Sequence, residues 1–349
     1  LALFAGMVAF SLNAIVLPRG QSFDFYPRYV GGQAFWNGES PYSDAVTARI
    51  QTGMWNYTLP PEGYDQQRFV YPAYTALVIA PLLALPVHTA IAIWMSAQYL
   101  AVLASIGVWL ALLGWRIPGW GLFVLLLGFG FAFRYPIDMY MVAQFTGTML
   151  LLISLALLSL ARKRDGAAGV LLALATIPPT IAAPLALVLL GGYGLHGRWR
   201  GVIGFAGTLL ILTLLTLLRI GWWIPDFLGG LSAYPGYAHP VWAPGLIDSP
   251  ILRVLVVGIA VAAIVWATFR LLPNHALDFA AIALTGTLLL VPQTGSYYLI
   301  LLIPPLLVAA HRALSLSLLP RLTIWGACAA AVISPWLYRT LSTPQIENL

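Results

Sequence analysis

Charged residues and cysteine are scarce in this chain. Only 8% of its 349 residues are charged and 60% are hydrophobic, whereas about a quarter of the residues in soluble globular proteins are charged. A soluble globule is excluded, because no fold of this size removes so much apolar surface from water. The single cysteine, Cys328, lies in an apolar run, which excludes a disulfide framework and a cysteine metal site. We therefore predict an all-α polytopic membrane protein.

Lysine is nearly absent. Lys163 is the single lysine, and arginine supplies the rest of the positive charge. No basic run is interleaved with aromatic residues, so membrane lipids rather than nucleic acid are the expected partners. Compact basic clusters at 162–164 and 198–200 mark a cytoplasmic side. That assignment leaves only Asp165 and Asp278 among the acidic residues inside and the remaining nine outside. We expect an integral protein of the bacterial plasma membrane whose active face points outward.

A helix needs roughly 17 to 25 apolar residues to cross hydrocarbon, and nine apolar stretches predict about nine full transmembrane helices, although several are short and must be extended by their flanks or packed inside. They are 1–17, 88–113, 118–133, 143–161, 201–218, 251–272, 276–291, 297–310 and 322–337. The chain begins at Leu1 inside the first stretch with no initiator Met, so we expect a truncated N-terminus. Residues 1–349 then form a single membrane domain with two long outer loops, 19–70 and 219–250.

Proline interrupts two further apolar segments. Pro178, Pro179 and Pro184 break the segment 166–195, which predicts two short helices that enter and return on the same side. The segment 71–86 is also split by prolines, and it is not expected to cross. Irregular backbone at membrane depth survives only when it is buried in protein or lines a wet cavity. These segments therefore predict a cavity that is open to the outer face and lined by the outer loops.

Asp24 is the strongest candidate for a chemical role in the first loop. It follows the first helix at the water–lipid boundary, between Phe23 and Phe25. Partial desolvation there would raise the pKa of its carboxyl group toward that of a general base. The alternative is structural, because an interfacial aspartate often caps a helix or pairs with a cation such as Arg28. Position alone favours that alternative.

The run 24–42 combines this aspartate with Tyr, Ala, Trp, Gly and Pro-Tyr at spacings that resemble the first-loop motif of glycosyltransferase family 87. The residues 69–72, Gln144 before a leucine-rich helix, and 168–170 at the start of the broken segment are also similar, so the resemblance extends to about Pro305. It implies a GT-C-like fold. It also implies transfer of a mannose- or pentose-like sugar from a polyprenyl-phosphate donor to a lipid or glycan acceptor of the cell envelope, with Asp24 as base.

Direct displacement with inversion needs one carboxylate and cations for the departing phosphate. Guanidinium groups bind phosphate bidentately, and the candidates for the donor phosphate are Arg28, Arg68, Arg134, Arg219 and Arg253. The alternative for each arginine is an interfacial side chain that reaches the lipid headgroups. The candidates for binding substrate are Tyr26, Tyr29, Trp36, Tyr71, Asp138, Gln144, His239, Tyr297 and Tyr298. A membrane-interface belt is the favoured explanation for most of the aromatic residues in the second loop. Arg134 and Asp138 have equal chances of facing the cavity or of pairing with each other.

No cofactor beyond the lipid-linked sugar is required by the sequence. His239, Asp226 and Asp248 lack the spacing of a metal site, so a divalent metal stays unsupported.

Two departures from the family favour a second hypothesis. Relatives commonly have a Lys-Pro pair where this chain has Pro178-Pro179. They also often have a histidine in the turn where this chain has the residues 292–298, which include Tyr297. The alternative is a catalytically inactive membrane subunit or scaffold with a protein partner. A transporter ranks last, because the chain has no internal repeat.

Overall fold

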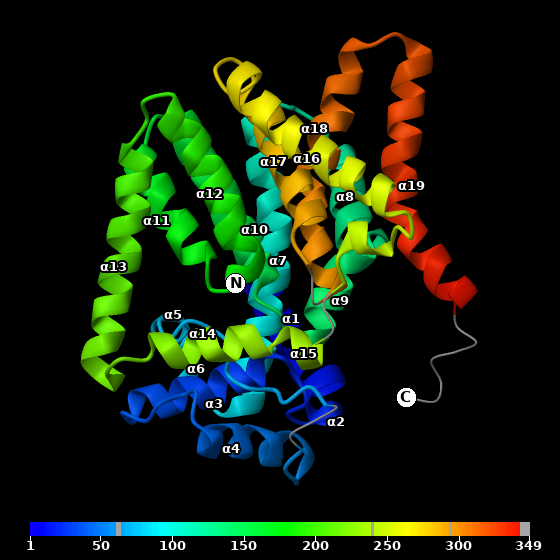
Figure 1. Cartoon of the computed structure of the whole chain (residues 1–349). Coiled ribbons are helices and arrows are strands. Elements are labelled where there is room, and N and C mark those ends of the chain that lie inside the picture. The colour runs from blue at the N-terminus through cyan, green and yellow to red at the C-terminus, as the bar shows by residue number, and fades with distance from the viewer. Residues whose placement is uncertain (61–63, 239–240, 293–294, 343–349) are drawn as a thin grey trace.

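Every regular element that the structure describes is a helix, as predicted (Figure 1). The computed structural model describes residues 1–60, 64–238, 241–292 and 295–342, and the side chains of these except 237, 238 and 337–342. The helices form a bundle with two unlike ends. We call the end that carries the helices of the loop 19–70 the loop face, and the end that carries the clusters 162–164 and 198–200 the basic face.

Six helical segments are long and apolar enough to cross a membrane within the described residues. They are Ala2–Arg19 (α1 Ala2–Phe10, η1 Ser11–Val16, α2 Leu17–Arg19), α7 (Val87–Leu113), α13 (Arg200–Ile220), α16 (Pro250–Arg270), Ser296–Ser315 (η4 Ser296–Leu302, α18 Ile303–Arg312, η5 Ala313–Ser315) and α19 (Leu318–Ser342). A seventh is possible if α8 (Gly119–Leu127) with η2 (Gly128–Ala132) and α9 (Arg134–Val142), bent by 56°, make one span.

The predicted count of about nine crossings is therefore not confirmed. The two remaining predicted crossings are helices, α10 (Thr146–Ala161) and α17 (Ala276–Leu290), but they have only 16 and 15 residues. At 1.5 Å per residue each is about 24 Å long or less, shorter than the hydrocarbon core of about 30 Å. They reach both faces only with help from their flanking segments.

The chain breaks at Pro178 and Pro179 as predicted. Helix α11 (Asp165–Ala175) leaves the basic face and α12 (Pro179–Leu195) returns to it, so the two form a hairpin whose tip lies inside the bundle (Figure 1). The hairpin packs closely on α13, because a Cβ atom on Gly169 would lie 2.1 Å from the carbonyl oxygen of Gly201. Small residues allow such close backbone contact between membrane helices. The Tyr74 hydroxyl, 2.8 Å from the Thr176 hydroxyl, ties the tip to the loop face.

The two long loops, 19–70 and 219–250, contain helices of their own. The first contains α3 (Phe25–Trp36) and α4 (Asp44–Trp55), and the second contains α14 (Ile224–Ala233), α15 (Pro235–Ala238) and η3 (Ala243–Leu246). Ser43 begins α4 because its hydroxyl accepts a hydrogen bond from the Val46 N–H. Residues 71–86 form only α5 (Thr75–Val78) and α6 (Ala80–Leu83), so they do not cross, as predicted.

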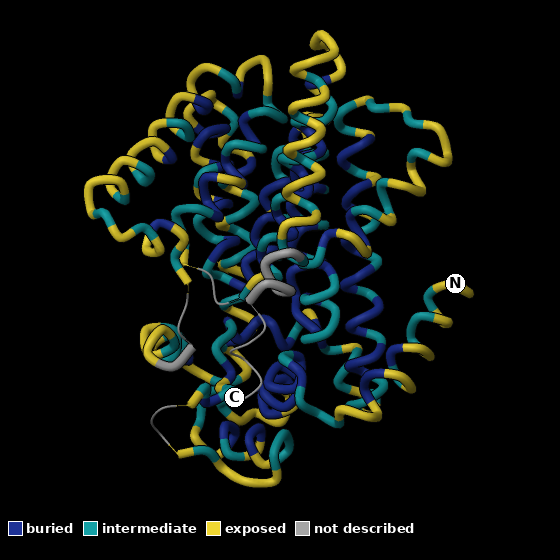
Figure 2. The backbone as a smooth tube through the Cα atoms, turned by 90° about the vertical axis from the view of Figure 1, so that its right-hand side faces the viewer, coloured by how far each residue is buried: buried dark blue, intermediate teal, exposed yellow. Residues whose placement is uncertain are grey.

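The two loops pack on one another through aromatic rings. Tyr42 of the first loop stacks on Trp223 with ring centroids 6.1 Å apart, and it also contacts Phe227 at 6.3 Å. Buried residues run through the centre of the molecule and into α3, whereas much of the outer surface of the bundle is exposed (Figure 2). The exposed residues of α13 and α16 are largely apolar, as lipid-facing residues are. The loop face is thus a packed layer over one end of the bundle.

Candidate active site

Asp24 is the residue immediately before α3, and its side chain does not cap that helix. Its backbone is fixed from two directions. Its N–H donates to the Val142 carbonyl oxygen at 3.0 Å, and its own carbonyl oxygen accepts from Arg28 Nη1 at 2.7 Å. Arg28 therefore contacts the Asp24 backbone and forms no ion pair with its carboxylate. Neither structural alternative, the cap or the direct ion pair, describes the Asp24 carboxylate.

Gln144 connects the carboxylate to the guanidinium instead. Its side-chain Nε2 donates to Asp24 Oδ2 at 2.5 Å, and its Oε1 accepts from Arg28 Nη2 at 2.7 Å. These two bonds fix which end of the amide faces which neighbour. Gln144 is held by the turn between α9 and α10, where Ala143 adopts a left-handed conformation (φ 59°) and accepts a 2.9 Å hydrogen bond from Trp94 Nε1.

Arg28 is the most deeply buried charged side chain of the site, with 1% of its surface exposed. The ring of Tyr71 lies 4.2 Å from its guanidinium carbon, a cation–π contact. Its Nε has no hydrogen-bond partner among the described residues. A guanidinium has five N–H donors, so Arg28 keeps donor capacity after binding Gln144 and the Asp24 backbone. Its charge is fixed in place beside the carboxylate.

Asp24 faces a cavity of about 130 Å³ on the loop face. The cavity is lined by Asp24, Pro27, Asp65, Gln67, Arg68, Val70, Tyr71, Gln144, Tyr234 and Tyr297. A narrower cavity of about 30 Å³ shares five of these residues and adds Arg28, Pro178, Pro179, Thr180, Leu231 and Tyr298. The two cavities therefore have a common wall, and the tip of the α11–α12 hairpin reaches the site. The loops 19–70 and 219–250 both contribute to the lining.

Burial raises the pKa of the Asp24 carboxyl above its ordinary value. The positive charge of Arg28 and the hydrogen bond from Gln144 act in the opposite direction, the negative charge of Asp65 raises this pKa further, and Arg19 lowers it. Burial also raises the pKa of Asp65, while the hydrogen bond from the Gln67 N–H lowers it. Two carboxyl groups with increased proton affinity thus line one cavity.

The predicted site residues fall into two groups. Asp24, Arg28, Arg68, Tyr71, Gln144, Tyr297 and Tyr298 line the two joined cavities. Arg68 lies there with 42% of its side chain exposed and a 3.3 Å ion pair to Asp44, whose side chain is 90% exposed. Arg28 and Gln144 belong to the innermost part of the site, and Arg68 belongs to its rim.

The other candidates lie elsewhere. Arg134 pairs with Asp138 at 3.1 Å, the alternative that the sequence left open, and Asp138 also accepts from the Ser296 hydroxyl. Three further side chains bind backbone carbonyl oxygens: Tyr29 binds Leu85, Arg253 binds Ile247, and Arg219 binds Trp36. Tyr26 and Trp36 line a different cavity. His239 lies outside the described residues.

Sequence reasoning missed Asp65 and Gln67 in the lining of the cavity. Asp65 and Gln67 come just before the residues 69–72 of the family motif, but nothing in their spacing indicates that they return to Asp24. Buried amides hold their segment in place, because Gln51 Nε2 donates to the Gln66 carbonyl oxygen at 3.0 Å. Among the described residues, no three His, Cys, Asp or Glu side chains gather in a way that would hold a metal ion.

Comparison with known families tests the resemblance noted above. The model of glycosyltransferase family 87 matches residues 69–292, about two thirds of the chain. The matched part includes Tyr71, Gln144 and the hairpin tip, whereas Asp24 and Arg28 precede it. A search of curated proteins finds no match. The helical fold and the family match are consistent with one another, and the chain belongs to glycosyltransferase family 87, a family of membrane glycosyltransferases.

Proposed function

We propose that this protein is an inverting glycosyltransferase that uses a polyprenyl-phosphate sugar, with a mannose- or pentose-like sugar, and that Asp24 is its general base. The acceptor is a hydroxyl group of a lipid or glycan. The observation that supports this most is the placement of the half-buried Asp24 carboxylate, which faces a cavity and is joined through Gln144 to the fixed charge of Arg28. A base and a cation are the groups that this displacement needs.

The reaction is a single displacement at the anomeric carbon of the donor sugar. Asp24 accepts the proton of the acceptor hydroxyl while the acceptor oxygen forms a bond to the anomeric carbon. The bond between that carbon and the phosphate oxygen breaks, and its electron pair leaves with the phosphate. Attack opposite the departing phosphate inverts the configuration at this carbon. The raised pKa of Asp24 suits this role, because a stronger base takes the proton more readily.

Arg68 is the better candidate for direct contact with the donor phosphate. Its partner Asp44 is almost fully exposed, and such surface ion pairs contribute little, about 0–1 kcal/mol. A phosphate in the cavity can therefore replace Asp44 as its partner. Arg28 supplies a second positive charge from beneath Tyr71. The two guanidinium groups stand in for the lysine that relatives place at Pro178–Pro179.

The sugar and the lipid chain have suitable surroundings in this arrangement. Tyr71 and Tyr297 line the cavity beside Asp24, and flat aromatic rings offer apolar surface to the C–H groups of a sugar ring. The loop face points out of the plasma membrane, because the basic clusters lie at the opposite end. The donor approaches from the membrane, and the acceptor approaches from the loop face.

Replacing Asp24 by asparagine tests the base. We expect Asp24→Asn to reduce sugar transfer in proteoliposomes by about 10²- to 10⁴-fold, the usual contribution of a general base, with an unchanged unfolding temperature. Polyprenyl-phosphate mannose and polyprenyl-phosphate arabinose serve as donors. Asp248→Asn is the matched control, because Asp248 is exposed in the second loop, and it should retain full transfer. Unimpaired transfer by Asp24→Asn would rule out Asp24 as the base.

The absence of a lysine at Pro178–Pro179 favours a second candidate function, that of an inactive membrane subunit. In that case the wild-type protein transfers neither sugar and copurifies in a fixed ratio with a partner protein. Transfer by the wild-type protein alone would eliminate the subunit hypothesis.

A further inference from the structure

A second and larger cavity lies on the loop face, along the opposite side of α3 from Asp24. Its volume is about 640 Å³, some five times that of the Asp24 cavity. Residues 26, 30 and 33 of α3 line it together with Asn37, which directly follows the helix, and their spacing of three and four places them on one side of it. Asp24 and Arg28 lie on the other face. Helix α3 is thus a wall between two cavities, and we call the larger one the α3 groove.

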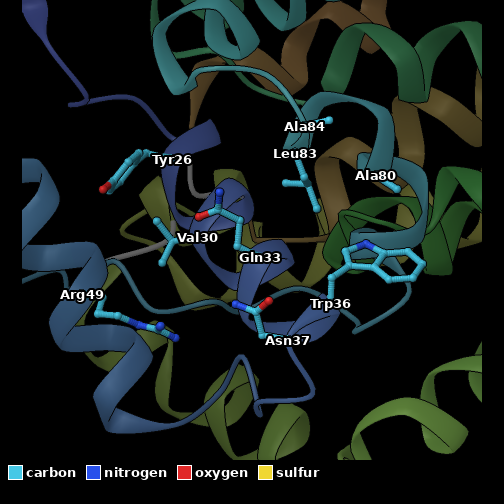
Figure 3. A pocket seen from close by; sticks show the side chains of 9 residues that line it. All are labelled: Tyr26, Val30, Gln33, Trp36, Asn37, Arg49, Ala80, Leu83 and Ala84. Carbon is cyan, nitrogen blue, oxygen red and sulfur yellow. The ribbon is translucent and has the colours of Figure 1, made fainter.

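The lining of the α3 groove mixes polar and apolar side chains. Gln33 and Asn37 lie between Arg49 of α4 and the indole of Trp36 (Figure 3). Val30 of α3 and Leu83 of α6 supply apolar surface. The side chains of Gln33 and Asn37 are exposed and make no hydrogen bond to any described residue, so their donors and acceptors are available to a ligand.

Trp36 is held in place with its ring accessible. Its Nε1 donates to the Ala76 carbonyl oxygen at 3.2 Å, and its ring packs edge-on against Phe35. The side chain nevertheless remains 44% exposed. An indole that is fixed at one end and open on its surface can stack on an apolar ring face. Together with two free amides, it offers the contacts that a sugar ring uses.

The charge of the α3 groove argues for a neutral ligand. Arg49 is the cation in its lining, and its guanidinium binds the Glu39 carboxylate. This pair leaves little net positive charge to attract a phosphate or an anionic lipid headgroup. Apolar walls with a few convergent polar groups are typical of small-molecule sites, and about 300–1,000 Å³ is their usual volume. A neutral carbohydrate fits both the charge and the size.

We propose that the α3 groove binds the carbohydrate portion of the acceptor, beyond the sugar whose hydroxyl reacts. This inference rests on the proposed function. The Asp24 cavity of about 130 Å³ is too small to hold a donor sugar together with an acceptor of several sugars. Tyr26, at the near end of the groove, is only two residues from Asp24, and α3 extends roughly 15 Å from Tyr26 to its last residue, Trp36. An acceptor whose reacting sugar lies at Asp24 would pass around the first residues of α3, which begins at Phe25, and its further sugars would then lie along the groove.

Binding of defined oligosaccharides to the full chain in nanodiscs tests this proposal. The probes are fluorescently labelled mannotetraose and arabinotetraose. We expect at least one to bind, and we expect the double variant Gln33→Ala/Asn37→Ala to bind it about tenfold more weakly, because two hydrogen bonds are lost. Asn274→Ala, an exposed amide on the basic face, is the control and should retain wild-type affinity. If the double variant keeps wild-type affinity, or neither tetrasaccharide binds, the proposal is wrong.

A kinetic comparison separates this proposal from the proposed function. The acceptors are octyl glycosides that carry either one or four units of the sugar that binds. In the double variant, KM for the tetrasaccharide acceptor should be about tenfold higher than in the wild-type protein, whereas KM for the monosaccharide acceptor should be unchanged. Asp24→Asn should abolish transfer yet keep the affinity for the tetrasaccharide. Loss of binding in the double variant with full transfer by Asp24→Asn would refute the base and retain the groove. Displacement of the tetrasaccharide by glycerophosphoglycerol would identify a lipid-headgroup site and overturn the proposal.

Discussion

Gln144 determines how the two charged groups of the site face one another. Its amide nitrogen can only donate and its amide oxygen can only accept, so the nitrogen meets the Asp24 carboxylate and the oxygen meets the Arg28 guanidinium. The carboxylate keeps the lone pairs that Gln144 does not use, and those are what an acceptor hydroxyl needs. The buried cation is stabilised without an ion pair to the carboxylate of the proposed base.

The acidic limb of the pH–rate profile should report the surroundings of Asp24. A base acts when it is deprotonated, so kcat/KM falls as the pH drops through its pKa. Because burial raises that pKa, the limb should lie above the ordinary aspartate value of about 3.9. Asp65→Asn removes a negative charge that raises the pKa of Asp24, so it should move the limb to lower pH. An unmoved limb would show that Asp65 does not interact with the base.

Arg28→Gln should move the same limb in the opposite direction. The positive charge of Arg28 lowers the pKa of Asp24, so its removal raises that pKa and shifts the limb to higher pH. The variant should also reduce kcat/KM by about 10²-fold or more, because a charge beside the departing phosphate is lost. Arg312→Gln, an exposed arginine on the basic face, is the control. A shift to lower pH in Arg28→Gln would contradict the assignment of Asp24 as base.

At the scale of elements, the site depends on close packing of α7 and α10. Gln144 lies just before α10, and the first turn of that helix is tied to α7 because the Thr148 N–H donates to Gln98 Oε1 at 2.8 Å. Gly147 lies directly against α7, since a Cβ atom there would be 2.2 Å from the Gln98 carbonyl oxygen. The position of Gln144 therefore follows from a contact between two membrane helices.

Gly147→Ala should separate these helices. The added methyl group meets backbone, which cannot move aside as a flexible side chain would, so we expect a loss of about 1–3 kcal/mol of stability and reduced transfer. Gly107→Ala on α7 is the matched control, because a Cβ atom there has nothing within 4 Å. Alanine in a helix interior is favoured over glycine by about 0.5–1 kcal/mol. Thermal unfolding of both variants gives the comparison, and equal unfolding temperatures would argue against the close contact.

At the scale of the whole molecule, the two ends of the bundle have different chemistry. The loop face carries both cavities around α3, and the basic face carries the arginine clusters. Arg198 at the basic face pairs with Asp165, which also fixes the start of α11. The hairpin thus connects the two ends, because α11 is anchored among cations at its base while its tip lines the Asp24 site. Placement of the chain in the membrane fixes the side on which sugar is transferred.

Cysteine labelling should report that placement. Cys328 is the single native thiol, so Cys328→Ser provides a background without cysteine. In it, Tyr57→Cys places a thiol on the exposed loop face and Arg164→Cys places one on the basic face. A membrane-impermeant maleimide should label Tyr57→Cys in intact cells and Arg164→Cys only after permeabilisation. The reverse pattern would put the loop face inside and contradict the outward active face.

Local sequence patterns predicted the frame of the molecule well. The proline break of the hairpin, the short helices of 71–86 and the all-helical class follow from backbone chemistry and hydropathy, which act over a few residues. The count of about nine full crossings stays unconfirmed, because α10 and α17 have only 16 and 15 residues. Helix length near a membrane surface depends on turns and packing as well as on hydropathy.

The candidate site was predictable only in part, because contacts between distant segments form it. Asp24 and Gln144 stood out separately, but nothing in the sequence showed that they bind one another across 120 residues. The sequence did not indicate that Asp65 lies beside Asp24. A buried hydrogen bond between Gln51 and Gln66 determines where the segment that carries Asp65 runs. Arg134 had equal chances of facing the cavity or pairing with Asp138, and the pairing is what the fold selects.

The unequal exposure of Arg28 and Arg68 makes the enzyme's response to dissolved salt selective. Mobile ions screen the interaction between exposed charges that lie more than about 10 Å apart in 0.1 M salt, or more than about 3 Å apart in 1 M salt, but they act weakly on charges that water does not reach. Arg28 lies beneath Tyr71 with 1% of its surface exposed, whereas 42% of the Arg68 side chain is exposed. Raising the ionic strength should therefore increase KM for the lipid-linked donor while the proton affinity of Asp24 stays constant.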